Sequence, residues 1–307
     1  MTLPLKSASL PCTRRQALGL LSAGASFLAW PAWSSAREKL PDFQFLVVSD
    51  THLGRNDNDS ATKQWQKTAK ELEAAKGDFI LHLGDLVDQG REKQYEVFQE
   101  IRKTIQKPMY EIPGNHDPQP LFEKYIRKQV DTSFSHAGVR FVLFNNAHTD
   151  SHDGFITQEQ IAWLAEQLAA AAKADEFVIL CCHVPVHENK HPDRGWYVKA
   201  DQGQTAFYEA LGHHRQRVLG LFHGHFHNGI RGWDDHGPWH EICFPSALYN
   251  QDRKLADQKA PGYNVTEFRP GYVLVRLNQQ GMLLQYIPLG EAGNAERMIK
   301  LTQFDAP

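Results

Sequence analysis

Five short segments of this chain carry histidine, aspartate or asparagine directly after a run of apolar residues. Carboxylate and amide oxygens, together with imidazole nitrogens, suit divalent ions such as manganese, iron, zinc or cobalt. A histidine that holds no ion can transfer a proton instead. The segments are 47–52 (VVSDTH), 80–88 (ILHLGDLVD), 109–117 (MYEIPGNHD), 178–183 (VILCCH) and 219–227 (LGLFHGHFH). They predict a metal-dependent site.

The apolar runs before these residues have the pattern of β-strands, and helical patterns separate several of them. Strands are predicted at 43–49, 79–83, 109–112, 177–182, 218–222, 239–244, 263–269, 272–278 and 281–288, helices at 62–76, 95–106 and 157–173, and a hairpin at 132–145. Alternation of strand and helix favours βαβ units. In such sheets the carboxyl ends of strands gather the functional loops. The five segments are therefore expected to converge in space.

In order, the segments read Asp-x-His, Gly-Asp-x-x-Asp, Gly-Asn-His-Asp, a single His and Gly-His-x-His. This order resembles the calcineurin-like metallophosphoesterases, and it spans residues 50 to 227. The resemblance implies an α/β (mixed α+β) fold in which two packed mixed β-sheets are flanked by helices, a four-layer metallophosphoesterase sandwich. A single domain over residues 37–307 is expected, since no repeat, low-complexity run or linker divides the chain.

The resemblance also implies two metal ions and a ligand set for each. One ion would be held by Asp50, His52 and His227, the other by Asn115, His183 and His225, with Asp85 as the bridge. These ligands accept divalent or mixed-valence ions of the manganese, iron, zinc and cobalt class. A shared carboxylate holds such ions about 3.5–4 Å apart, and a hydroxide between them would attack phosphorus opposite the leaving oxygen.

Two further residues are expected to act without holding an ion. By the resemblance, His116 stands near the phosphate and donates a proton to the leaving group or hydrogen-bonds the developing charge. Asp88 matches the carboxylate that orients this histidine in the family. Further candidates for lining the substrate pocket are His148, His152, His187 and His191.

Within the superfamily the motifs look closest to the branch of cyclic-nucleotide and glycerophosphodiester phosphodiesterases. Purple acid phosphatases place a metal-binding tyrosine where this chain has Asp88, and protein phosphatases usually have Arg-Gly where it has Gln89-Gly90. The expected function is hydrolysis of small phosphodiesters. The alternatives are a periplasmic phosphomonoesterase and a non-catalytic metal-binding protein of the cell envelope. The second fits less well, because a purely structural site needs no spare proton donor such as His116.

The overall charge disfavours a general nucleic-acid binder. The formal net charge is −3, and removing residues 1–36, with three basic and no acidic residues, leaves 30 basic against 36 acidic residues, or −6. A mildly acidic protein lacks the basic surface that long polyanions require. A small phosphate ester is therefore the expected substrate and no nucleic-acid partner is expected.

Residues 1–36 are predicted to be a twin-arginine signal peptide that is cleaved after Ala36. Arg14 and Arg15 precede an apolar region, and small residues occupy the positions before the cut. An N-terminal membrane anchor is the alternative, but the apolar region falls short of the roughly 20 residues a spanning helix needs. The predicted partner is the twin-arginine export machinery, with no stable membrane insertion after cleavage. The mature protein is expected to be periplasmic or secreted; the sequence predicts no oligomeric state.

Three cysteines remain in the predicted mature chain, namely Cys181, Cys182 and Cys243. An odd number with two adjacent members on an apolar run does not describe a disulfide framework. They are expected to be buried free thiols.

Overall fold

The computed structural model of this 307-residue chain describes residues 40–57, 59–188, 195–227, 230, 239–250, 269–290 and 295–301. The predicted signal peptide, His191 and nearly all of the predicted strand 263–269 lie outside the described residues.

Two mixed β-sheets form the centre of the molecule. The six-stranded sheet has the order β11 (Ala295–Ile299), β10 (Gly281–Pro288), β9 (Gly271–Asn278), β1 (Phe43–Val48), β2 (Ile80–His82) and β3 (Met109–Glu111). The five-stranded sheet has the order β4 (Thr132–His136), β5 (Val139–Leu143), β6 (Phe177–Cys181), β7 (Val218–His223) and β8 (Glu241–Cys243). Parallel pairing joins β1 to β3 through β2, and β5 to β8 through β6 and β7. Each sheet therefore has several carboxyl ends at one edge.

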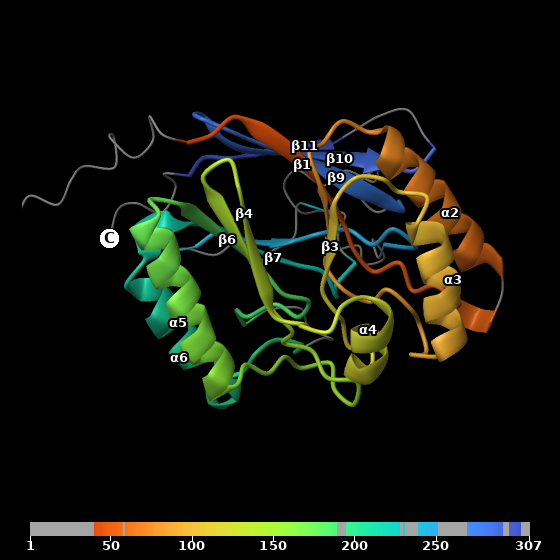
Figure 1. Ribbon diagram of the computed structural model, residues 1–307, viewed down its shortest axis with the longest axis horizontal. Helices are drawn as coiled ribbons and strands as arrows, with labels where there is room; N and C mark the ends of the chain where they lie inside the picture. The colour runs from red at the N-terminus through yellow and green to blue at the C-terminus, as the bar shows by residue number, and fades with distance from the viewer. Residues whose placement is uncertain are drawn as a thin grey trace, which may run out of the picture.

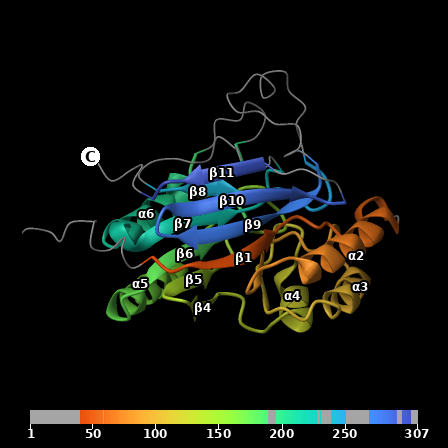
Figure 2. The ribbon, with the colours of Figure 1, turned by 90° about the horizontal axis from the view of Figure 1, so that it is seen from above.

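Helices cover the outer face of each sheet. They are α2 (Asp59–Ala74), α3 (Glu92–Arg102), α4 (Gln119–Tyr125), α5 (Gln158–Lys173) and α6 (Gln204–Gly212), with short 3-10 turns at 55–57, 200–202 and 215–217. Figure 1 shows α2 and α3 on one side of the sheets and α5 and α6 on the opposite side. The view from above in Figure 2 shows the same separation. This confirms the predicted layers of helix, sheet, sheet and helix.

The alternation of side chains along β1 shows how these layers are held together. Phe45 and Val47 point into an apolar cluster shared by both sheets. Leu46 and Val48 point the other way, into a cluster with α2, α3 and α4. A third cluster joins α5 and α6 to the five-stranded sheet. Full burial of one such side chain contributes about 1.5–3 kcal/mol, so the packed faces fix the two sheets against each other.

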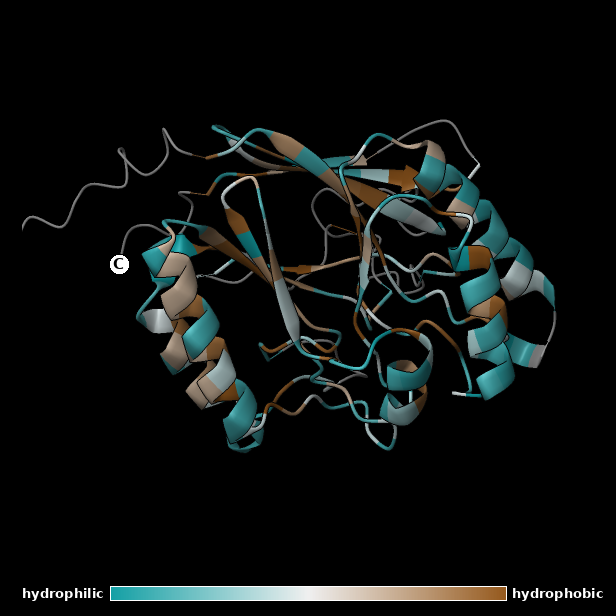
Figure 3. Cartoon of the chain, viewed as in Figure 1, coloured by the Kyte–Doolittle hydropathy of each residue, from teal (hydrophilic) through white to brown (hydrophobic). Residues whose placement is uncertain are grey.

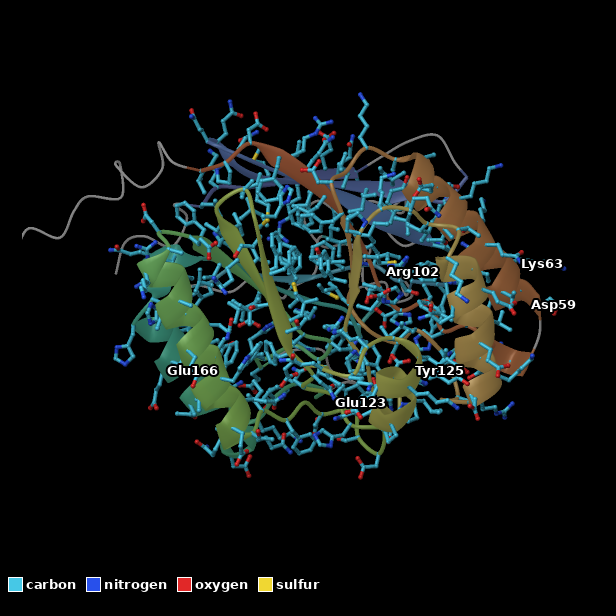
Figure 4. The ribbon with its side chains drawn as sticks, in the orientation of Figure 1. Asp59, Lys63, Arg102, Glu123, Tyr125 and Glu166 are labelled. Atoms are coloured by element: carbon cyan, nitrogen blue, oxygen red, sulfur yellow. The ribbon has the colours of Figure 1, made fainter. Side chains whose placement is uncertain are left out.

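The helices are amphipathic, as their sequence pattern requires. In Figure 3 the teal, hydrophilic positions of α2, α3 and α5 alternate with brown positions along each helix. Asp59 and Lys63 of α2 and Glu166 of α5 are exposed and extend from opposite ends of the molecule (Figure 4). On the inner face of α2, Trp65 is buried and stacks on Phe98 of α3. The polar surface and the apolar interior therefore follow from helical spacing alone.

Most predicted elements are present with small shifts at their ends. Helix α5 begins after Thr157, whose side chain accepts a hydrogen bond from the backbone N–H of Gln160, and the Gln160 side chain accepts one from the backbone N–H of Thr157. This is a complete capping box. The predicted strand 239–244 is shorter, at Glu241–Cys243. Helices α4 and α6 and strand β11 were not predicted from the sequence.

The three predicted thiols are free and buried. Among the described residues, no helix combines the length and apolar character needed to cross a bilayer.

Candidate active site

The side chains predicted to hold metal ions meet where the carboxyl ends of the two sheets approach each other. A parallel bridge between Ser49 and Ser246 joins the segment after β1 to the segment after β8. The hydroxyl of Ser246 also donates to the carbonyl of Asp50 at 2.7 Å. The ends of both sheets are thereby held together at the site.

Backbone conformation marks the same residues. Eight non-glycine residues described by the structure have positive φ, and five of them are predicted metal ligands: Asp50, His52, Asp85, His225 and His227. This left-handed conformation is unfavourable for residues with a Cβ, and it persists only where the surroundings enforce it. The turns therefore aim these side chains at one another at a cost to local stability.

The first group of side chains is Asp50, His52 and His227, all buried. His227 Nε2 lies 3.0 Å from Asp50 Oδ1 and 3.2 Å from His52 Nε2. Ligand atoms bound to one ion at about 2.0–2.2 Å are separated by distances of this size. The trio predicted for one ion is therefore brought together.

The second group is Asp85, His183 and His225, also buried. His183 Nε2 lies 3.3 Å from Asp85 Oδ2 and 3.2 Å from His225 Nδ1. The same oxygen of Asp85 lies 3.4 Å from His52 Nε2, which belongs to the first group. Asp85 thus touches both groups, as the predicted bridge must.

One buried atom tests whether this arrangement suits metal ions. Asn115 Oδ1 is enclosed and has no hydrogen-bond partner among the described residues. A buried polar atom without a partner costs about 1–3 kcal/mol, and an ion would compensate that cost. The donor set of carboxylates, imidazoles and one amide oxygen fits two divalent cations.

Glycine is required at two places beside these groups. A side chain at Gly114 would collide with the Asp85 carboxylate and backbone, and one at Gly224 would collide with Ser49 and Asp50. Absence of a Cβ therefore lets the segments after β3 and β7 close onto the carboxylates.

Electrostatics of the site favour ionised carboxylates beside imidazoles. Burial raises the pKa of Asp50, but His227 and His183 outweigh it and lower that pKa far below its usual value. Burial lowers the pKa of His183, but the charge and hydrogen bond of Asp85 raise it overall to about 9. Binding of a cation here therefore displaces a proton from His183.

His116 lies beside these groups, as predicted, with its ring 4.7 Å from that of His52. Its Nδ1 donates to the backbone carbonyl of Asp88 at 2.5 Å. Burial lowers its pKa, yet the charge of Asp85 and the Asp88 carbonyl raise it overall. Since Nδ1 is committed to the carbonyl, Nε2 is the nitrogen left to meet a substrate.

The carboxylate of Asp88 was predicted to orient His116, but in the structure it contacts other side chains. Its Oδ1 lies 3.2 Å from His52 Nδ1 and 3.1 Å from Arg55 Nη1. The predicted contact with His116 exists, but the backbone carbonyl makes it. The positive charge of Arg55 and the buried imidazole of His52 draw the Asp88 side chain toward the first metal-ligand group.

Asp117 ties two functional loops together, a role the sequence analysis did not assign. Its carboxylate accepts from the backbone N–H groups of Leu86 and Gly114 at 3.0 and 2.9 Å, and from Tyr95 Oη at 2.9 Å. Burial and the charge of Asp85 raise its pKa to about 6. The Asp after Gly-Asn-His was the available signal, since carboxylates readily accept backbone N–H groups in turns.

Asn146 similarly holds the backbone of a functional loop, the one that follows β6 of the five-stranded sheet. Its Oδ1 accepts from the N–H groups of His183 and Val184 at 3.2 and 3.0 Å, and its Nδ2 donates to the Val184 carbonyl at 2.6 Å. The ring of His183 is fixed further by the Leu83 carbonyl, 2.7 Å from Nδ1. No local pattern in the sequence predicts this pairing, because its partners lie 37 and 38 residues away.

A cavity of about 400 Å³ opens beside His116. Its lining is Asp88, Gln89, Asn115, His116, Pro118, Thr149, Asp150, Ser151 and His152. Of the histidines predicted to line the pocket, His152 does so, and His148 lines a neighbouring cavity. His187 is buried instead, with its Nδ1 2.5 Å from Glu241 Oε2.

Comparison with protein families decides the class of this site. The model of the calcineurin-like phosphoesterases matches residues 43–229. The chain belongs to this family. It is a metallophosphoesterase, a hydrolase of phosphate esters, whose family binds a dinuclear metal site. The predicted family is thereby confirmed.

Individual relatives are more distant. A 3',5'-cyclic-nucleotide phosphodiesterase of Nostoc sp. is 26% identical over 255 residues, covering 80% of this chain and 91% of the relative. A probable glycerophosphodiester phosphodiesterase of Arcobacter nitrofigilis is 28% identical over 162 residues, covering 50% of this chain and 57% of the relative. A probable cyclic nucleotide phosphodiesterase of Fibrobacter succinogenes is 27% identical, covering 59% of this chain and 71% of the relative.

Solved structures share the fold of this metallophosphoesterase. A dimetal phosphatase from Danio rerio superposes with a TM-score of 0.60 at 15% identity, covering 84% of this chain and 99% of the other. A purple acid phosphatase from yellow lupin gives a TM-score of 0.56 at 15% identity, covering 83% of this chain and 53% of the other. At these identities the likeness concerns the fold.

Proposed function

We propose that this metallophosphoesterase hydrolyses small phosphodiesters, with 3',5'-cyclic nucleotides as the preferred class. The relatives named as cyclic-nucleotide and glycerophosphodiester phosphodiesterases support a diester substrate. In this proposal Asp50, His52 and His227 hold one ion, Asn115, His183 and His225 hold the other, and Asp85 is shared between them.

The observation that carries the diester preference is the charge of the cavity wall. Among its nine lining residues are the carboxylates Asp88 and Asp150 and no lysine or arginine. Arg55 is close, but its guanidinium is paired with Asp88. A diester carries one negative charge, whereas a monoester carries nearly two at neutral pH. Because Arg55 offsets the charge of Asp88, the Asp150 carboxylate is the group whose repulsion penalises the monoester more.

The protein's own residues supply positioning and a proton. Two bound divalent ions would supply Lewis-acid polarisation of the phosphoryl group and an acidified water. The Asp88 carbonyl orients His116 so that Nε2 is available to the substrate. We propose that His116, protonated at both ring nitrogens, donates its proton from Nε2 to the leaving oxygen and keeps the Nδ1 proton that it shares with the Asp88 carbonyl. The Asp88 carboxylate acts on His52.

Steady-state kinetics on matched chromogenic substrates test the proposal. We expect kcat/KM for bis(p-nitrophenyl) phosphate to exceed that for p-nitrophenyl phosphate by about 10-fold or more, as about 1.4 kcal/mol of extra repulsion requires. Asp150→Asn should narrow this ratio, because the exposed Asp150 side chain supplies part of the repulsion. A higher kcat/KM for the monoester would show a phosphomonoesterase instead.

We further propose that the protein is exported by the twin-arginine machinery and acts in the periplasm or outside the cell. Support comes from Arg14-Arg15 and the apolar region that follows them. Replacing both arginines by lysine should retain the precursor in the cytoplasmic fraction. Equal export of the variant and the wild type would contradict this route.

A further inference from the structure

Two aromatic rings flank the second group of ligands, and one of them, that of His152, lines the substrate cavity. His152 and Trp196 stack on each other, with centroids 4.2 Å apart and planes inclined by 20°. Their rings lie 5.8 and 5.3 Å from the ring of His225. Because His152 also lines the cavity that contains Asn115 and His116, the stack extends from the metal-ligand group to the space where a substrate would sit.

The stack is held in place by contacts between two segments that are distant in sequence. His152 belongs to the loop after β5, and Trp196 to the segment after β6. The Nζ of Lys199 pairs with the Asp153 carboxylate, and the N–H of Gly154 donates to the Tyr197 carbonyl at 3.3 Å. The two segments are thus joined directly beside the stacked rings. A preorganised platform of this kind loses little entropy when a flat ligand binds.

The other residues of the cavity wall indicate which kind of ligand would bind beside the stacked rings. Asp88, Gln89, Thr149 and Ser151 offer oxygen and nitrogen atoms, so they suit a sugar and a phosphate. The aromatic rings of this lining are those of His116 and His152, and His116 is already assigned to proton transfer. A cyclic nucleotide combines these two kinds of surface, since it carries one flat aromatic base on a polar sugar phosphate.

Other aromatic side chains near the site are placed less favourably. Tyr249 lies on the opposite flank, 4.4 Å from the ring of His227, but the guanidinium of Arg55 covers its ring at 4.5 Å. Trp163 of α5 lines the neighbouring cavity, together with His148. Of these rings, that of His152 lines the cavity beside Asn115 and His116, so the stack of His152 and Trp196 is better placed for a base.

We propose that His152 and Trp196 form a stacking subsite for the nucleobase, which makes the enzyme favour cyclic nucleotides over aliphatic phosphodiesters. This inference rests on the proposed diesterase function and assigns its specificity. Stacking on an aromatic side chain contributes to the binding of every base. The subsite therefore favours a ligand with a base but does not distinguish one base from another. Binding energy of this kind acts mainly on KM.

The test compares 3',5'-cyclic AMP with glycerophosphoethanolamine, an aliphatic diester, in the metal-loaded protein. Trp196→Ala should lower the ratio of kcat/KM for cyclic AMP to kcat/KM for glycerophosphoethanolamine by about 10-fold, or about 1.4 kcal/mol. The loss should appear in KM for cyclic AMP. Trp196→Phe should restore most of the ratio. His152→Ala should lower the same ratio. Because His152 is exposed, this variant tests the subsite even if Trp196→Ala fails to fold.

Trp163→Ala is the matched control and should leave the ratio unchanged. An unchanged ratio in both Trp196→Ala and His152→Ala, or a shift in Trp163→Ala alone, would overturn the subsite. A wild type that cleaves glycerophosphoethanolamine but does not bind cyclic AMP would also overturn it while leaving the diesterase function intact. If the wild type cleaves neither diester, the proposed function fails, and calorimetric binding of cyclic AMP to the wild type and to Trp196→Ala still tests the subsite separately.

Discussion

The two sheets bring different chemistry to one site. Loops of the six-stranded sheet provide both carboxylates of the ligand groups, together with His52 and the amide of Asn115, whereas loops of the five-stranded sheet provide imidazoles alone. Each group draws on both sheets, since His227 joins Asp50 and His52, and His183 and His225 join Asp85. Neither sheet has a complete set by itself. Metal binding therefore depends on how the sheets pack on each other.

The two halves also hold their ligands in different ways. In the six-stranded half, the Asp117 carboxylate ties backbone N–H groups of two loops together. In the five-stranded half, the neutral amide of Asn146 holds the backbone at His183 and Val184. The carboxylates that attract cations therefore come from the six-stranded half. The five-stranded half supplies imidazoles, among which His183 gives up a proton when a cation binds.

Removal of the shared carboxylate should have the largest effect. Asp85→Ala takes away the carboxylate whose Oδ2 lies 3.4 Å from His52 of the first ligand group and 3.3 Å from His183 of the second. Bound metals supply several kcal/mol of transition-state stabilisation, so turnover should fall by roughly 10⁴-fold at 1.4 kcal/mol per tenfold. Metal analysis of the purified variant should show loss of both ions. Retention of two ions would contradict the bridging position.

His116→Ala should separate catalysis from metal binding. The variant should keep its metal content and lose roughly 10²–10⁴-fold in turnover, the usual contribution of a general acid. A leaving group that needs no proton, such as p-nitrophenolate, should reduce the loss. Unchanged turnover on cyclic AMP would remove His116 from the mechanism.

Asn146→Ala probes the five-stranded half without touching a ligand side chain. It removes three hydrogen bonds to the backbone at His183 and Val184. Groups that orient metal ligands are typically worth 10–100-fold in metal affinity, so activity should be recovered only at correspondingly higher metal concentration. Asn145→Ala is the matched control. Equal metal affinity in both variants would show that the Asn146 amide is not needed for orientation.

Asp88→Asn should have a smaller effect than His116→Ala, because the carbonyl that orients His116 is retained. The variant loses the charge next to His52 and Arg55. About 10-fold weaker metal affinity is expected, with turnover restored at saturating metal. A loss as large as that of His116→Ala, at saturating metal, would instead assign the carboxylate a direct part in the proton transfer.

Each sheet contains a buried glutamate, and the two should affect the stability of the protein differently. Burial raises the pKa of Glu111 above its usual value despite Arg102. Burial also acts on Glu241, but the hydrogen bonds and charge of His187 and the hydroxyl of Tyr208 lower that pKa overall. The two carboxyl groups should therefore change stability with pH in opposite directions.

The sign follows from the proton count of each state. The stability that Glu241 contributes is present above its unfolded pKa of about 4.5 and is lost as pH falls through its lower folded pKa. Ionisation of Glu111 costs stability as pH rises from about 4.5 through its higher folded pKa. Urea unfolding of Glu241→Gln and Glu111→Gln against the wild type from acid to neutral pH should show differences of about 1–3 kcal/mol with opposite slopes. Parallel slopes would contradict the two opposite shifts.

Much of the architecture could be predicted because it depends on local pattern. The apolar runs before Asp50, Asp85 and His183 identify buried strands, and the helical spacing of residues 157–173 identifies α5. Convergence of the predicted ligands followed from the rule that strand ends gather functional loops. The short helix α4, which begins after Pro118 with Gln119 and Pro120, lacks enough turns to show a period.

The positions of Asp88 and Asn146 could not be predicted from the sequence, since they depend on long-range contacts. The Asp88 carboxylate turns toward Arg55, 33 residues away. Asn146 meets a segment that follows an entire helix and strand. Such pairings depend on how the loops close, which no local spacing encodes.

Metal reconstitution of the chelator-treated protein is the decisive test that two bound ions are needed for hydrolysis. Divalent metal should be titrated back while cyclic AMP hydrolysis, bound metal per chain and thermal unfolding are followed together. We expect hydrolysis to reach its full rate only when two ions are bound, with a rise in Tm because the ions join both sheets. Full hydrolysis by the metal-free protein, or saturation of activity with no bound metal, would contradict the account.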